Sequence, residues 1–178
     1  MKTRDLIFCG IFAALIATGA FLKVTIPPIP VVFSMQSFFV VLAALTLGAK
    51  LSATSAGVYV VLGLIGVPVF TLGGGIGYVL QPTFGYLLGF IAGAYICGYL
   101  SQISEKLSWQ IFSGTIALIV IYAIGTVYFY FIKNVYFGSG ISAWYVILNC
   151  AIVFLPFDFA CTVFAAAISK RIKKALGK

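Results

Sequence analysis

The sequence predicts an all-α integral membrane protein, with six transmembrane helices forming a single transmembrane domain over residues 1–178. The first observation is composition: 63% of the residues are hydrophobic and 8% are charged, too few polar groups to cover a water-facing surface. The second is that the apolar residues fall into six runs, separated by segments that carry Gly, Pro or charge. The third is that basic residues gather on alternate connections.

The six predicted helices cover residues 6–22, 34–48, 51–65, 83–100, 109–132 and 144–168. The first run follows a basic N-terminus as a signal peptide would, but the rest of the chain is equally hydrophobic, which favours a retained helix. The second run would form a helix about 22 Å long, shorter than a hydrocarbon core of about 30 Å. Short or interrupted spans are typical of binding sites in membrane transport proteins.

The distribution of basic residues predicts that both termini are cytoplasmic. With the N-terminus inside, nine of the eleven Lys and Arg residues fall on inner segments, and only Lys23 and Lys133 fall on outer ones. Five of the nine belong to the C-terminal tail from Lys170 to Lys178, as expected for an end at an anionic leaflet. The net charge of +8 therefore indicates membrane lipid as a partner and does not indicate nucleic acid.

Two of the predicted outer connections have unusual composition. One carries Pro27, Pro28 and Pro30, and the other, residues 66–82, is glycine-rich and uncharged. Irregular backbone at membrane depth is tolerated where it lines a cavity or packs in protein. We therefore expect a binding site at the outer side, under these two connections.

The inventory of reactive side chains argues against an enzyme. The chain has no His and only three acids, Asp5, Glu105 and Asp158. A His-based triad, a His-ligated metal site and a carboxylate cage for a hard cation are therefore excluded. The sequence predicts no catalytic residue, no metal site and no cofactor.

Asp158 is the most informative residue because it lies inside the sixth predicted span. A carboxylate at that depth costs several kcal/mol, so it should face the protein interior and have a partner. Its structural interpretation is an acid bonded to a neighbouring helix. Its functional interpretation is an acceptor for a ligand with N–H donors. Pro156 interrupts the helix nearby and frees a backbone carbonyl.

Further candidates for ligand contact come from four other segments. Gly73, Gly74 and Gly75 lack the Lys-Ser/Thr ending of a P-loop, but their amides could form a nest for a carboxylate. Gln36 and Asn149 could bind an amide-like group, or could simply bond to neighbouring helices. Phe33 and Tyr86 could form the walls of an apolar pocket.

Small residues form stripes on two of the predicted helices. Gly85, Gly89 and Gly93 recur every four residues in the fourth span, a spacing that lets helices pack closely. In the first span, Ala13 and Ala17 accompany a second small face that starts at Gly10. This double face is wide enough to dock a second protein as well.

The chain contains no P-loop, so it cannot hydrolyse ATP itself. A binding subunit that is driven by separate ATPases would explain a chain with a binding site but no ATP-binding motif of its own. An autonomous carrier or oligomeric channel for a small solute remains as an alternative, and so does a structural membrane protein that organises partners.

The central segment resembles a known family. Residues 63–70, with the sequence GLIGVPVF, precede the glycines, and residues 82–90 contain PTFGYLLGF. Together with Ala13-x-x-x-Ala17 and Pro156-x-Asp158, these segments resemble BioY, the biotin-binding S component of bacterial energy-coupling factor (ECF) transporters. The resemblance covers nearly the whole chain.

The resemblance implies a six-helix S-component bundle in the cell membrane, with biotin bound near the extracellular side. It implies a transmembrane T component and cytosolic ABC-type ATPases as partners, with Ala13 and Ala17 docking on the T component. Asp158 and Tyr86 match the family's acid and tyrosine. Cys161 stands where the family commonly has a lysine, one helical turn from Asp158, and it therefore belongs to the expected substrate site.

Overall fold

The computed structural model describes residues 3–25 and 31–175. Helix α1 (Thr3–Phe21) leads into a two-stranded antiparallel hairpin of β1 (Lys23–Val24) and β2 (Phe33–Ser34). The elements that follow are α2 (Gln36–Leu47), α3 (Ala49–Leu64), the 3-10 helix η1 (Ile76–Leu80), α4 (Phe84–Leu100), α5 (Leu107–Phe131), the π-helix η2 (Ile132–Tyr136), α6 (Ala143–Ile147), the π-helix η3 (Leu148–Ile152) and α7 (Leu155–Ala175). Lys2, Pro27, Pro28, Pro30 and Lys178 lie outside the described residues.

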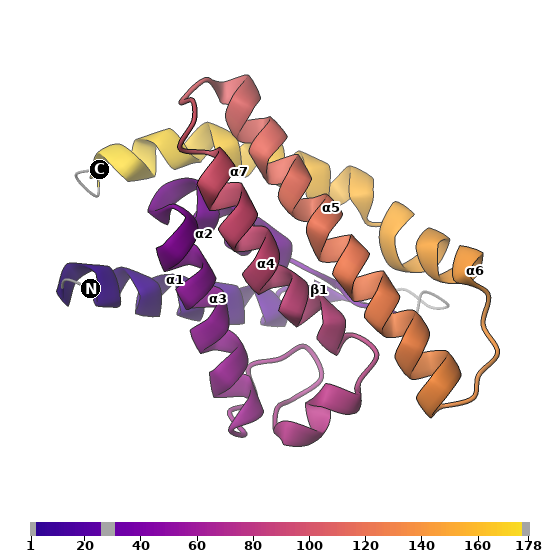
Figure 1. Ribbon diagram of the computed structural model, residues 1–178. Coiled ribbons are helices and arrows are strands. Elements are labelled where there is room, and N and C mark those ends of the chain that lie inside the picture. The colour runs from indigo at the N-terminus through magenta and orange to yellow at the C-terminus, as the bar shows by residue number, and fades with distance from the viewer. Residues whose placement is uncertain (1–2, 26–30, 176–178) are drawn as a thin grey trace.

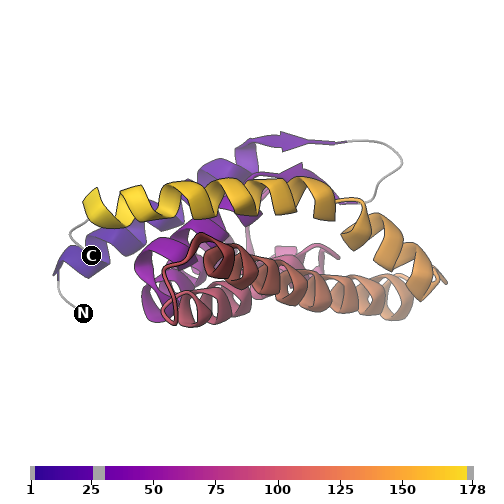
Figure 2. The ribbon, with the colours of Figure 1, turned by 90° about the horizontal axis from the view of Figure 1, so that it is seen from above.

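These elements form six helical rods within the described part of the chain, which confirms the predicted all-α fold. Three rods are long and apolar enough to cross a membrane: Thr3–Phe21, Leu107–Tyr136 and Ala143–Ala175. The other three, α2, α3 and α4, are shorter apolar helices. Both chain ends lie at one end of the bundle, and the α5–α6 connection lies at the other (Figures 1 and 2). An even number of crossings is consistent with this placement.

Helix α2 is short because it lies inside the protein. It has 12 residues, about 18 Å of helix, and nearly all of its side chains are buried. It packs against α1, α3, α4 and α7. A helix that is apolar on every side is expected in such a position, so the short second run marks the centre of the bundle.

The glycine stripe of α4 packs against α5, as the sequence predicts. A Cβ atom at Gly89 would lie 2.9 Å from the Cα atom of Ile121, and one at Gly85 would lie 2.2 Å from the Cβ atom of Tyr128. Only hydrogen fits at these positions. The close approach places Tyr86 of α4 and Tyr122 of α5 on adjacent helices, with ring centroids 6.3 Å apart.

The sixth rod is broken next to Pro156, where the sequence predicted an interruption of the sixth span. It consists of α6, η3 and α7, and α6 bends away from the axis of α7 (Figure 2). Pro156 has no N–H group to continue the ladder, and the chain turns at Val153 and Phe154 before α7 begins. This break places Asp158 in the first turn of α7, facing the interior.

Candidate functional site

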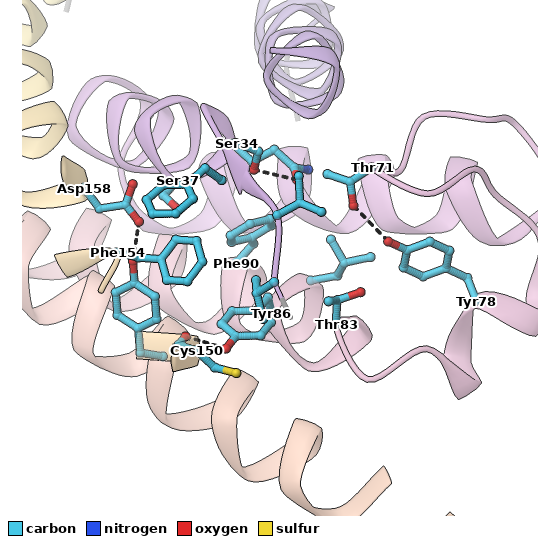
Figure 3. A pocket seen from close by; sticks show the side chains of 16 residues that line it. Ser34, Ser37, Thr71, Tyr78, Thr83, Tyr86, Phe90, Cys150, Phe154 and Asp158 are labelled. Carbon is cyan, nitrogen blue, oxygen red and sulfur yellow. Dashed lines mark hydrogen bonds between the residues drawn. The ribbon is translucent and has the colours of Figure 1, made fainter. Parts of the chain in front are cut away.

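A cavity opens near the first turns of α2, α4 and α7, at the end of the bundle away from the chain termini. This is the end at which the sequence predicts a site. Sixteen residues line the cavity (Figure 3), and they come from the hairpin, α2, the α3–α4 connection, α4, α5, η3 and α7. Its volume is about 60 Å³, well below the 300–1,000 Å³ of typical ligand pockets.

Asp158 supplies the carboxylate of the cavity. Its side chain is 6% exposed, and Oδ2 accepts a hydrogen bond from the hydroxyl of Tyr122 on α5. Ser37 of α2 is a second hydroxyl partner. Asp158, Ser37 and Phe154 lie together at one end of the cavity (Figure 3). A carboxylate with two neutral donors remains an acceptor for further N–H groups.

Aromatic rings form the walls next to this carboxylate. Phe33 of β2 packs on Phe154, with ring centroids 4.0 Å apart and planes 30° apart. Tyr86 of α4 is buried, and its hydroxyl donates to the backbone carbonyl of Cys150 at 2.6 Å. Phe90 completes this part of the lining. Both Phe33 and Tyr86 therefore lie where the sequence predicts, in an apolar wall.

Hydroxyl groups gather at the other end of the cavity (Figure 3). The hydroxyls of Thr71 and Tyr78 are 3.1 Å apart and share a hydrogen bond. Thr83 Oγ1 is buried and has no hydrogen-bond partner in the described residues. An unpaired buried hydroxyl is costly, so Thr83 is suited to contact a polar group of a ligand.

Gln36 lines the cavity but is already engaged in a hydrogen-bond chain. Its Nε2 donates to the hydroxyl of Tyr59 at 2.6 Å, and that hydroxyl donates to the carbonyl of Val69 at 3.2 Å. Its Oε1 accepts from Ser34 Oγ at 3.3 Å. Gln36 therefore ties α2 to α3 and to the α3–α4 connection while it faces the cavity.

The predicted glycine nest does not lie in the cavity lining. The N–H groups of Gly73 and Gly75 donate to the carbonyls of Phe70 and Gly63, at 3.2 and 2.7 Å. A Cβ atom at Gly74 would lie 2.3 Å from the carbonyl oxygen of Val67. The three glycines thus make a compact backbone fold, and the N–H groups of Gly73 and Gly75 are not free to bind a carboxylate in this structure.

Asn149 and Cys161 also lie outside the cavity lining. The amide of Asn149 donates to the carbonyl of Tyr145, one turn earlier in the same rod, at 2.9 Å. Cys161 is half-buried and free. Cys161, where the resemblance implies a lysine, therefore does not line the cavity in this structure. The Asp158 carboxylate accepts its hydrogen bond from the hydroxyl of Tyr122.

The predicted docking residues Ala13 and Ala17 lie on the side of α1 that faces the core. Ala13 is 4% exposed and belongs to the hydrophobic core, and Ala17 is half-buried against that core. The small residues of α1 that are exposed are Gly10, Ala14 and Thr18. The two faces of α1 that carry small residues look alike in the sequence. The packing of α1 on α2 and α3 determines which of the two faces is buried.

Sequence reasoning missed most of the cavity lining, including the polar residues Ser37, Thr83 and Tyr122. Tyr122 is one of ten tyrosines, and nothing in its local sequence marks it. The rule that a buried carboxylate needs a partner predicted that such a residue exists without locating it. No cluster of three metal-ligating side chains occurs within residues 3–25 and 31–175.

Comparison with known proteins gives a consistent result. The model of a protein family described as the BioY family matches residues 1–178. A protein of Lysinibacillus sphaericus described as "Probable biotin transporter BioY" is 40% identical over 175 residues, which cover 97% of this chain and 88% of that protein. The "Biotin transporter BioY" of Thermotoga maritima is also 40% identical over 175 residues, covering 96% of each chain.

A solved structure is similar to this chain over nearly its whole length. The crystal structure described as the S-component for biotin from an ECF-type ABC transporter matches with a TM-score of 0.73 and 26% sequence identity. The match covers 97% of this chain and 92% of the other. The similarity therefore extends to the whole arrangement of rods.

Proposed function

The chain belongs to the BioY family, and we propose that it is a biotin-binding subunit that captures biotin at the extracellular side for an ECF-type importer. It is a multi-pass protein of the cell membrane with the fold of an ECF S-component. One observation above all supports the proposed ligand. A buried carboxylate, held by two hydroxyls, lies at one end of an aromatic cavity, and an unpaired hydroxyl lies at the other end.

Biotin has the donors and acceptors that this arrangement would recognise. Its ureido ring offers two N–H groups, which suit the acceptor capacity of Asp158. Its thioether ring and alkyl chain suit walls such as Phe33, Tyr86 and Phe90. Its carboxylate would accept a hydrogen bond from Thr83 at the opposite end of the cavity.

The small volume of the cavity implies that its walls separate when biotin enters. The contact between Phe33 and Phe154 is the one most suited to open, because Phe33 belongs to the two-residue strand β2 and Phe154 lies in the turn before α7. Both positions are outside the long helices, where backbone movement costs least. We expect the helices themselves to move little.

The energy for import would come from partner proteins: a transmembrane T component and cytosolic ABC-type ATPases. The exposed face of α1 with Gly10, Ala14 and Thr18 is suited to dock a second helix, since small residues allow close helix approach. Ala13 and Ala17, the predicted docking residues, lie on the adjoining face of the same helix.

Calorimetric titration tests the proposed ligand directly. Biotin is added to detergent-purified protein that has been washed free of ligand carried from the cells. We expect tight binding with one biotin per chain. Folded, ligand-free protein that gives no heat with biotin would refute the proposed substrate, and thermal unfolding of the same sample shows whether it is folded.

A further inference from the structure

A second cavity lies at the opposite end of the bundle, between the α4–α5 connection and the end of α7. It has a volume of about 230 Å³. It is lined by Glu105, Leu107, Gln110, Ala166, Ala167, Ser169, Lys170 and Lys173. None of these residues lines the cavity around Asp158, so the two sites are separate.

Gln110 is the strongest sign that this cavity binds something. Its side chain is 4% exposed, and its Nε2 donates to the carbonyls of Ser101 and Ser104 at 2.8 and 2.6 Å. The two bonds fix the amide and leave Oε1 buried with no partner in the described residues. A buried acceptor without a donor is costly, so Oε1 is suited to accept a hydrogen bond from a ligand.

The charged side chains around Gln110 form no ion pair with one another. Glu105, Lys170 and Lys173 make no hydrogen bond or ion pair with any described residue. Two ammonium groups and one carboxylate leave the cavity with one net positive charge. The first residue of α5, Leu107, also lines the cavity, so the positive end of that helix dipole faces it.

Leu107, Ala166 and Ala167 form an apolar part of the lining, beside the hydroxyl of Ser169. Leu107 is 52% exposed, and Ala167 is exposed beside buried Ala166. The last turns of α7 and the α4–α5 connection also lie on segments whose basic residues predict a cytoplasmic location. The cavity thus combines two lysines, hydrogen-bond acceptors and an apolar flank, which are the groups that a lipid headgroup and its first acyl carbons would contact.

We propose that this cavity binds the headgroup of an anionic phospholipid whose phosphodiester carries a hydroxylated alcohol, as in phosphatidylglycerol. The phosphate would contact Lys170 and Lys173. The two hydroxyls would donate to Gln110 Oε1 and to Glu105, and the first acyl carbons would lie along Leu107 and Ala167. The site would anchor the end of α7 to the cytoplasmic leaflet, and it does not depend on biotin as the substrate.

Native mass spectrometry in a neutral detergent would test the proposal, with phosphatidylglycerol as the probe lipid. Phosphatidylmethanol serves as a comparison lipid, because it has the same charge but no headgroup hydroxyl. We expect one tightly bound phosphatidylglycerol per chain, held several-fold more tightly than phosphatidylmethanol. The Lys170→Gln, Lys173→Gln double variant should lose about tenfold in affinity, the loss expected for two ion pairs that are partly exposed to solvent. Glu105→Ala should remove much of the preference between the two lipids.

Lys174→Gln provides the matched control. It removes the same charge from the same tail, but Lys174 does not line the cavity. If Lys174→Gln weakens lipid binding as much as a single cavity lysine variant does, the interaction is diffuse attraction to the tail and the proposal is wrong. Competition by millimolar inorganic phosphate or glycerol phosphate would mean a soluble anion site and would also overturn it. Thermal unfolding of each variant without lipid identifies any that fail to fold.

Discussion

Asp158 has acceptor capacity that its protein partners do not use. A carboxylate offers about four lone-pair sites, and the described partners are the hydroxyls of Tyr122 and Ser37. Two N–H groups of a ureido ring would therefore complete its hydrogen bonding without displacing either hydroxyl. A neutral amide at this position would offer fewer acceptors and would turn N–H donors toward the ligand.

Asp158→Asn should therefore weaken biotin binding by roughly 10- to 150-fold, the range expected for losing hydrogen bonds to a charged group. Titration calorimetry measures the change. Asn149→Ala is the matched control, because Asn149 lies outside the cavity and bonds within its own rod. An unchanged affinity in Asp158→Asn would make Asp158 a structural acid, and a large loss in Asn149→Ala would mean that the ligand lies elsewhere.

Thr83 allows the two ends of the ligand to be distinguished. Its hydroxyl is buried without a partner, so the isosteric change Thr83→Val should leave the melting temperature unchanged or higher. The same change should weaken biotin binding by about fivefold, for one lost hydrogen bond of about 1 kcal/mol. Binding of biotin methyl ester should change less than binding of biotin. Equal losses for both ligands would place the carboxylate away from Thr83.

At the scale of the helix, the α4–α5 contact connects stability to the cavity. Gly89→Ala would bring a Cβ atom to 2.9 Å from the Ile121 backbone, and overpacking of this kind costs about 1–3 kcal/mol. We expect a lower melting temperature and weaker biotin binding, because the added methyl group would push α4 and α5 apart and so displace Tyr86 and Tyr122. Gly57→Ala is the control, since a Cβ atom there meets nothing within 4 Å. Equal melting temperatures would show that the contact is loose.

The same scale explains how much of the fold the sequence could predict. Helix positions follow from runs of apolar residues, a local property, and five of the six rods lie within about four residues of their predicted ranges. The sixth rod continues past its predicted end at Ile168 to Ala175. The break at Pro156 is local too, and the sequence predicted an interruption there, although not that α6 would bend away. The burial of nearly every residue of α2 follows from its uniformly apolar composition.

The candidate site was less predictable because it depends on partners distant in sequence. Asp158 was identified from its own cost of burial, but its partner Tyr122 is 36 residues away. Gly73 and Gly75 were expected to bind a ligand, but their N–H groups donate to backbone carbonyls. Composition identifies which groups need hydrogen bonds, whereas only the tertiary structure determines which are already satisfied. The burial of Ala13 was unpredictable for the same reason.

At the scale of the whole molecule, the proposal assigns biotin binding to this chain and the energy for import to its partners. A variant should therefore be able to lose transport and keep binding. Gly10 is an exposed residue on α1, and a Cβ atom there meets nothing within 4 Å. Gly10→Leu should therefore leave biotin binding unchanged. In liposomes that hold the T component and the ATPases, it should lower ATP-dependent biotin uptake about tenfold or more, the effect of weakening a docking contact by 1.4 kcal/mol.

Gly57→Leu is the control for this experiment, because it adds the same side chain at another open glycine, on α3. It should keep both binding and uptake. Loss of uptake in both variants would mean that any added bulk blocks reorientation, and α1 would then have no special role.

Liposomes that hold this chain alone provide the decisive comparison. The sequence contains no P-loop, and we expect the chain to bind biotin there without accumulating it. Accumulation by the chain alone would make it an autonomous carrier, and the proposed T component and ATPases would be unnecessary.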